Sequence, residues 1–246
     1  LGLVSKIDSS NDLGGALDYQ DLNFKVNVPT IKAGVFTLWG IALIDKFSDE
    51  FDADPDTWEY TGDNYDYDTK QYMAAGGISH KYFVTDRSYL KTTLATTFFE
   101  NNATQGTHDL LLNRSPYMEM FRRQTNLVLT SALNHKFGAR HNNRTGFAYT
   151  RMIYDMNFDL APLETAPLES ISKGKGQTDL LNVYTQSSIN INDRLNLTLG
   201  VNAQVLTLNN AWSVEPRAGV KWQAGKRSTL ALAYGLHSRM EKMDVY

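Results

Sequence analysis

Apolar and polar residues alternate one by one along this chain, and that alternation limits the possible fold more than any other feature. From Leu195 to Val205, every odd position holds leucine, valine or alanine, and every even position holds asparagine, threonine, glycine or glutamine. A helix would spread these apolar residues around its circumference, whereas a β-strand places them all on one face. The segment is therefore predicted to be a strand with one apolar face.

The same pattern recurs often enough to predict an all-β chain of about ten strands. Regular alternation predicts strands at 22–28, 90–98, 181–189, 195–205 and 230–236, and less regular patterns predict strands near 34–45, 70–82, 122–137, 144–155 and 214–224.

The lengths of these segments point to a membrane. Several reach about ten residues, whereas strands of soluble proteins are most often about 5–6 residues long and a tilted transmembrane strand needs about 9–11. The predicted connections also alternate between short and long, as in outer-membrane barrels with short periplasmic turns. The short connections are expected near 29–33, 83–88, 138–143, 192–194 and 225–227, and the longer ones near 46–69, 101–121, 156–178 and 207–213.

These features predict an antiparallel transmembrane β-barrel that contacts lipid in the bacterial outer membrane. Composition agrees, because a mean hydropathy of −0.38 suits spanning strands whose inward half is polar. The chain has no cysteine and a sequence pI of about 6.0. We therefore expect no disulfide framework, and the charge gives no sign of nucleic-acid binding. The sequence predicts no resident metal and no cofactor.

Residues 1–246 are expected to be a partial barrel domain. The pattern is already under way at the first residues, and Met240–Met243 looks like the opening of a further loop. Open sheet edges in lipid would leave backbone groups unpaired at a cost of several kcal/mol each, so further strands are expected to close the wall.

Several segments resemble barrel strands of TonB-dependent receptors of the type common in Bacteroidota. One is Leu17–Lys25, followed after a short turn by Gly34–Gly40. The most specific is the strand Val214-Glu215-Pro216-Arg217-Ala218-Gly219, which leads to a second strand with Tyr234-Gly235-Leu236-His237-Ser238. The resemblance extends over most of the chain.

The resemblance implies a 22-stranded barrel closed by a plug, of which this chain supplies about ten strands and no plug. It implies active uptake of a scarce ligand, either a small molecule or an oligomer, driven by TonB acting through the absent plug region. A surface lipoprotein that caps the barrel is a further expected partner. In this interpretation the chain is not an enzyme and carries no catalytic residue.

Charged residues on the strand near 214–224 are the first candidate site. Glu215, Arg217 and Lys221 share one face, and the apolar neighbours Val214 and Trp222 share the other. A charge facing lipid is costly, so the charged face is predicted to point into the lumen or toward the plug. A structural ion pair is the simpler interpretation, and contact with the ligand path is the functional one. A bulge or a break in pairing is expected at Pro216, which lacks an N–H.

An acidic segment at 45–70 is the second candidate site, with ten acidic residues and two lysines. Asp52, Asp54 and Asp56 have the spacing that begins a calcium loop, but Thr57 stands where such a loop needs glycine. A solvated extracellular loop without metal is favoured. Its candidates for ligand or partner contact are Asp52, Asp54, Asp56, Trp58, Tyr60, Tyr65 and Tyr67.

Three other functions remain open at this stage. A passive porin would have the same wall without a plug. A ten-stranded barrel protease would need acids and a histidine that converge, for which His108 and Asp109 are the nearest pair. A soluble β-sheet protein that binds or scaffolds would stay monodisperse without detergent.

Overall fold

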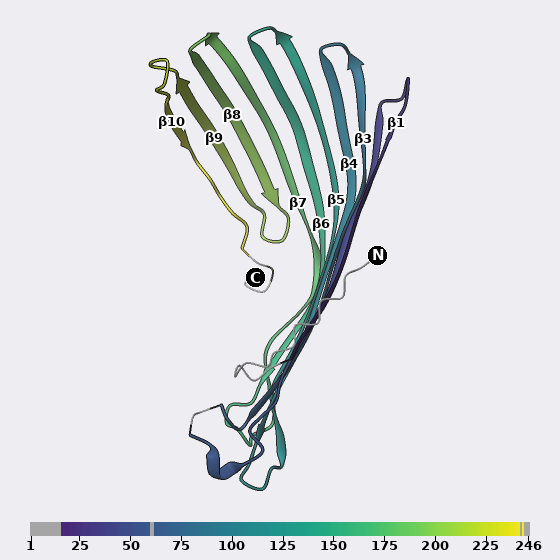
Figure 1. Cartoon of the computed structure of the whole chain (residues 1–246), viewed down its shortest axis with the longest axis vertical. Coiled ribbons are helices and arrows are strands. Elements are labelled where there is room, and N and C mark those ends of the chain that lie inside the picture. Colours follow the sequence, from purple (N-terminus) through teal and green to yellow (C-terminus); the bar gives the residue numbers. More distant parts are fainter. Residues whose placement is uncertain (1–15, 60–61, 242, 244–246) are drawn as a thin grey trace.

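A computed structural model describes residues 16–59, 62–241 and 243, and it contains one sheet of ten antiparallel strands (Figure 1). Each strand pairs with its neighbours in sequence, so the order is β1 to β10 without a crossover. The strands are β1 (Ala16–Pro29), β2 (Val35–Asp49), β3 (Tyr65–Thr85), β4 (Ser88–His108), β5 (Arg114–Gly138), β6 (His141–Leu160), β7 (Glu169–Asn192), β8 (Leu195–Leu206), β9 (Ala211–Trp222) and β10 (Leu230–Gly235). One 3-10 turn, η1 (Pro55–Thr57), lies between β2 and β3.

The hairpin registers align the apolar rows of neighbouring strands with one another on one face of the sheet. One row of paired positions across β1 to β9 is apolar or aromatic at each step, and the adjacent row is polar at all but one. The first row is Val26, Leu38, Ile78, Leu94, Leu129, Tyr149, Leu181, Val205 and Trp212, and the second is Asn27, Thr37, Ser79, Thr93, Thr130, Ala148, Asn182, Gln204 and Ser213. We call the face of the first row the apolar face and the other the polar face.

Nothing in the described part of the chain covers the apolar face. Leu94 is 63% exposed and Leu232 is 78% exposed, and no described large side chain is fully buried. The sheet therefore has no core of the soluble kind, in which two layers bury each other. An apolar surface of this extent, with the backbone paired along its length, suits the hydrocarbon of a bilayer.

Two groups of neighbouring strands differ strongly in length. β8 and β9 have 12 residues each, close to what a bilayer requires. β3 to β7 have 20 to 25 residues and continue beyond the level of the β8–β9 connection, toward the end that carries η1 (Figure 1). They therefore project from the membrane on the side opposite the short turns.

The long loops predicted from the sequence are therefore longer than the observed ones. The observed connections are 50–64, 109–113, 161–168 and 207–210, because strand pairing continues through most of the residues expected in loops. Outside the bilayer, strands need no apolar alternation. Ladder bonds and cross-strand ion pairs hold them instead, such as Arg123 with Glu100 and Lys175 with Asp155, each at 2.7 Å.

The bulge predicted at Pro216 does not occur where β9 pairs with β8. Val201 lies opposite Pro216 with no register shift. On the other side, the β9–β10 ladder ends at Arg217 and Gly235, and the Leu236 N–H then donates to the Pro216 carbonyl at 3.1 Å. Proline has no N–H to return this bond, which explains why the pairing with β10 stops there.

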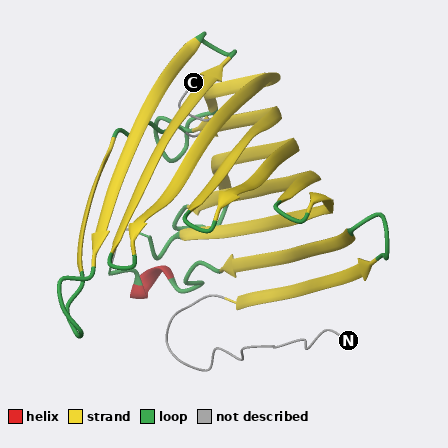
Figure 2. Cartoon of the chain, turned by 90° about the horizontal axis from the view of Figure 1, so that it is seen from above, coloured by secondary structure: helices red, strands yellow, loops and turns green. Residues whose placement is uncertain are grey.

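The sheet curves and is open within the described residues (Figure 2). β1 pairs only with β2, and β10 pairs only with β9. The structure therefore contains no closed ten-stranded barrel over residues 16–59 and 62–241. No helix among the described residues is long and apolar enough to cross a membrane.

We expect adjacent arginine substitutions on β8 to differ sharply in effect. Leu199→Arg places a charge on the apolar face in the middle of a 12-residue strand and should cost about 2–4 kcal/mol, whereas Thr198→Arg faces the polar side beside Gly219 and should cost far less. Urea unfolding of the receptor in lipid vesicles measures both. Equal costs for the two variants would contradict the assignment of the faces.

Candidate functional site

Glu215 is the most completely buried charged group on the polar face. Its side chain is 3% exposed, and its carboxylate accepts hydrogen bonds from several directions. Oε1 accepts from the Ser238 N–H at 2.9 Å and from the Ser238 hydroxyl at 2.5 Å, and Oε2 accepts from Arg217 at 2.6 Å and from Asn202 at 3.3 Å. Buried carboxylates need such donors, so the site is a satisfied ion pair in a hydrogen-bonded network.

Arg217 and Lys221 lie on the same face as Glu215, but they differ from each other in their contacts and exposure. Arg217 pairs with Glu215, and its side chain passes beside Gly235 on β10, where an added Cβ would lie 3.1 Å from Arg217 Cγ. Lys221 is exposed and lies opposite Asn196. The three predicted residues therefore share a face, but only Glu215 and Arg217 come together.

The segment after β10 crosses the polar face and is held at two places. Ser238 bonds to Glu215, Ser213 and Gln204. Met243 packs in a small cluster with Met152 and Leu206. These contacts join residues that are far apart in the sequence, and no alternation pattern indicates them.

A second cluster lies where β3, β4 and β5 project beyond the bilayer. Arg114 binds the Asp66 carboxylate with two hydrogen bonds, at 2.6 and 2.8 Å, and the Gly106 N–H donates to it at 2.9 Å. The bonds from Arg114, together with the one from Gly106, lower the pKa of Asp66 against the opposing effect of burial. We call Asp66, Gly106, His108 and Arg114 the Asp66 cluster.

The Asp66 cluster anchors the acidic loop at 50–64. The rings of His108 and Phe51 stack with their centroids 3.5 Å apart, and His108 Nε2 lies 3.6 Å from Asp66. Asn64 donates to Thr107 and to the His108 carbonyl. The loop is therefore held at both of its ends against β4.

Tyr65 and Tyr67 are not in this loop, since they are the first and third residues of β3. The Tyr65 hydroxyl donates to Glu164 at 3.0 Å, and its ring meets Tyr117 edge-on. Burial, and then the bond to Glu164, raise the pKa of Tyr65 to about 12, so the phenol stays protonated at neutral pH. Tyr67 lies beside Phe47.

The tip of the loop is ordered by its own acids. The Asp52 carboxylate accepts from Thr57 and from the Asp54 N–H, and Asp54 caps η1. The Trp58 indole donates to the Asp52 carbonyl at 2.7 Å. Asp56 lies within η1 and is exposed, whereas Tyr60 lies outside the described residues. No three His, Asp or Glu side chains in the described chain are grouped to hold a metal ion.

The histidine considered for a protease does not form a dyad with its neighbour. His108 Nδ1 lies 3.2 Å from the Asn64 carbonyl, while the Asp109 carboxylate accepts from the N–H groups of Leu111 and Asn113. The two side chains thus serve different local structures, so this pair gives no support to the protease alternative.

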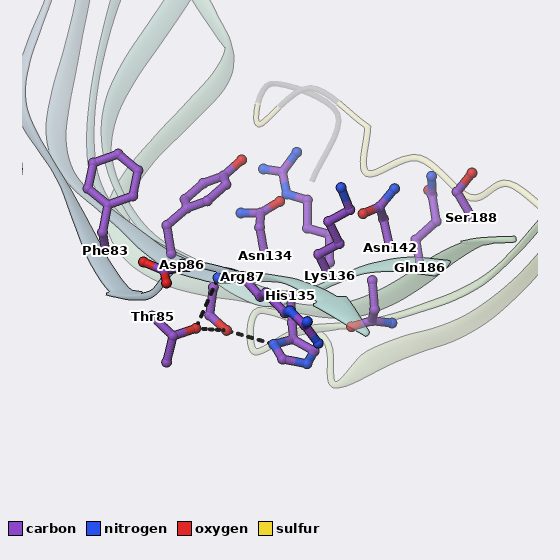
Figure 3. Close-up of a pocket in the computed structure, with 14 residues that line it drawn as sticks. Phe83, Thr85, Asp86, Arg87, Asn134, His135, Lys136, Asn142, Gln186 and Ser188 are labelled. Carbon is purple, nitrogen blue, oxygen red and sulfur yellow. Dashed lines mark hydrogen bonds between the residues drawn. The ribbon is translucent and has the colours of Figure 1, made fainter. Parts of the chain in front are cut away.

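A hollow of about 420 Å³ lies on the polar face near the short turns of β3–β4 and β5–β6 (Figure 3). Lys136, Asn142, Gln186 and Ser188 project from the same side of the sheet, while His135 lies on the opposite side and bonds to Ser88 at 2.6 Å. Most of the side chains around the hollow can donate hydrogen bonds or carry positive charge, and Asp86 adds a carboxylate. Sequence analysis did not single these residues out, because they gather only when β3 to β7 pair.

Ten antiparallel strands, nine of them with 12 or more residues, an apolar face suited to lipid and turns of unequal length define the wall of an outer-membrane β-barrel. The family model described as "TonB dependent receptor-like, beta-barrel" matches residues 4–238. This chain belongs to that family, and it is part of an outer-membrane barrel. No curated protein gives a significant match.

Several solved structures match over most of this chain. The toluene transporter TbuX of Ralstonia pickettii is 13% identical, with a TM-score of 0.46 over 92% of this chain and 64% of that one. A mutant of the ferric enterobactin receptor of Pseudomonas aeruginosa is 11% identical, with a TM-score of 0.46 over 94% of this chain and 42% of that one. The translocator domain of the autotransporter NalP from Neisseria meningitidis is 13% identical, with a TM-score of 0.35 over 92% and 83%. The chain thus spans less than two thirds of the first two structures.

We expect Glu215→Gln to destabilise the wall by about 1–3 kcal/mol, because Arg217 loses its charged partner and the Ser238 contacts weaken. Lys226→Gln at an exposed position of the following short turn is the control and should change stability by less than about 0.5 kcal/mol. Urea unfolding in vesicles measures both. A cost for Glu215→Gln as small as the control's would show that the network contributes little.

The stabilising contacts of Asp66 in the Asp66 cluster should persist in mild acid. Because the folded pKa of Asp66 is below the unfolded value of about 3.9, its stabilising contribution is complete above that value and disappears as pH falls through the folded pKa. Hydrogen exchange at the outer ends of β3 and β5, corrected for intrinsic pH dependence, should stay slow between pH 8 and 5. Asp66→Asn should already exchange fast at pH 7, and Asp68→Asn should not. Loss of protection in the wild type near pH 5 would contradict this.

Proposed function

We propose that this chain is part of the barrel wall of a TonB-dependent importer that takes up a scarce ligand across the outer membrane. Membership of the TonB-dependent receptor family, over residues 4–238, carries the proposal. Members of this family are generally transporters rather than enzymes. The remaining strands and a plug belong, in this proposal, to parts of the receptor outside these 246 residues.

The two faces of the sheet support this role. The apolar face meets lipid, and the polar face, with Glu215, Arg217 and Lys221, lines the lumen that the plug fills. The open edges at β1 and β10 then pair with further strands, since unpaired backbone in lipid is costly.

The projecting ends of β3 to β7 supply the surface for ligand capture. Asp52, Asp54, Asp56, Trp58, Tyr60, Tyr65 and Tyr67 are proposed contacts for the ligand or for a capping lipoprotein. Anchoring by the Asp66 cluster holds the loop on a rigid support, as binding loops require. The Bacteroidota type and the lipoprotein stay predictions of the sequence resemblance. TonB, engaging the plug, is the proposed source of energy.

Two measurements on the full-length receptor test this function. The periplasmic domain of TonB should retain the purified receptor on a column, and the receptor should leave a planar bilayer closed because the plug fills the lumen. Failure to bind TonB, together with a steady open conductance, would assign the chain to a passive porin instead.

A further inference from the structure

Charge is distributed very unevenly along the strands. The seven residues of each strand that adjoin a short turn, or all six residues in the case of β10, together hold seven Lys or Arg side chains and no Asp or Glu. All seven lie on the polar face, by the register of the hairpins. Arg217 is paired with Glu215. We call the other six the basic belt, and they are Lys25, Lys81, Lys91, Lys136, Arg144 and Lys221.

The strand ends that carry the basic belt contain no Asp or Glu of their own. None of the six cations forms an ion pair within the described residues. Lys81 and Lys91 even lie directly opposite each other on β3 and β4, an arrangement of like charges that destabilises a sheet. Lys81 Nζ lies 4.3 Å from the Tyr89 ring centre, and Arg144 lies 5.6 Å from that of Tyr184. These contacts hold cations at the sheet without neutralising them.

The opposite end of the wall is acidic. Residues 45–70 hold ten acids and two lysines, and six of the acids lie in the loop at 50–64. An anionic ligand arriving from that side would be repelled before it reached the basic belt. The belt also extends from β1 to β9, which is broader than a small ligand needs. Both observations favour a resident protein surface as its partner.

We infer that the basic belt holds an acidic face of the domain that closes the barrel, at the periplasmic end of the lumen. This inference depends on the proposed function, because it assigns a partner to the lumen of the same receptor. The hollow of Figure 3 is the middle of this contact, where Lys136 and Arg144 stand among amide donors that suit carboxylate groups. The closing domain supplies Asp and Glu side chains to these cations, in addition to Asp86, the carboxylate of the β3–β4 turn that lines the hollow.

Charge reversal in the full-length receptor tests the inference. The belt variant combines Lys91→Glu, Lys136→Glu and Arg144→Glu. The control variant combines Lys32→Glu, Arg194→Glu and Lys226→Glu, which make the same charge change at exposed positions in the short turns. Each protein is placed in a planar bilayer, and the fraction of conducting channels is recorded as urea is added. A gel-mobility assay of the folded barrel shows that each variant is intact.

The belt variant should open at lower urea, with the open fraction at a given urea concentration raised about 3- to 150-fold, the range expected for three exposed ion pairs. The control variant should behave as the wild type. Raising KCl from 0.1 to 1 M, which shortens the screening length from about 10 to 3 Å, should also open the wild type at lower urea but should not open the belt variant further.

Identical midpoints for the belt variant, the control variant and the wild type would overturn the inference. An unchanged midpoint with reversed anion–cation selectivity of the opened channel would assign the belt to permeating anions and also overturn it. Wild-type channels that conduct without urea would instead contradict the proposed function, because no closing domain would be present.

Discussion

The backbone hydrogen-bond ladder, whose register does not slip within the spanning part of the strands, is the constraint on which the rest of this structure depends. In lipid each unpaired N–H or carbonyl costs several kcal/mol, so the strands must pair along their whole spanning length. Because side chains alternate, one slip between two strands would move every leucine of one strand to the polar face. The register shifts that do occur lie close to the turns or in the projecting ends, for example at Phe83/Thr85 and at Gln105/Gly106.

Beyond the bilayer the same hydrogen-bond ladder continues, but different side-chain contacts stabilise it. There β3 to β7 are stabilised by polar contacts, and Asp66 with Arg114 is the best-formed of them. A Cβ at position 106 would overlap the Arg114 guanidinium, so glycine at that position leaves room for the arginine to reach Asp66. Rigid projecting strands then support an acidic loop whose own side chains are largely engaged with one another. The result is a wall with one face for lipid, one for the lumen and a supported outer surface.

The two ends of this wall carry opposite charge. The six cations of the basic belt, which form no ion pair within the described part of the chain, occupy the polar face near the short turns, and acids are concentrated at the opposite end. Close to the boundary between these regions, Glu215 and Arg217 neutralise each other within a network that includes Ser238. A polar face can carry such a pattern because water or another protein surface meets it, whereas any of these charges on the apolar face would be costly.

The spanning strands were predictable because lipid imposes a strict alternation on them, as at Leu195–Val205, which is β8 almost to the residue. The projecting ends were not, since polar strands such as the outer part of β5 carry no such alternation, and Tyr65 and Tyr67 consequently looked like loop residues. The shared face of Glu215 and Arg217 followed from their spacing, but the Ser238 contact did not.

The sequence by itself therefore determined the fold class, the number of strands and the shared face of Glu215, Arg217 and Lys221. Those properties depend on the period of two, which is local. Only the tertiary structure decided which residues meet across strands, including Asp66 with Arg114, Glu215 with Ser238, and Lys81 with Lys91. Such contacts depend on hairpin register and strand length, which arise from pairing along the whole sheet.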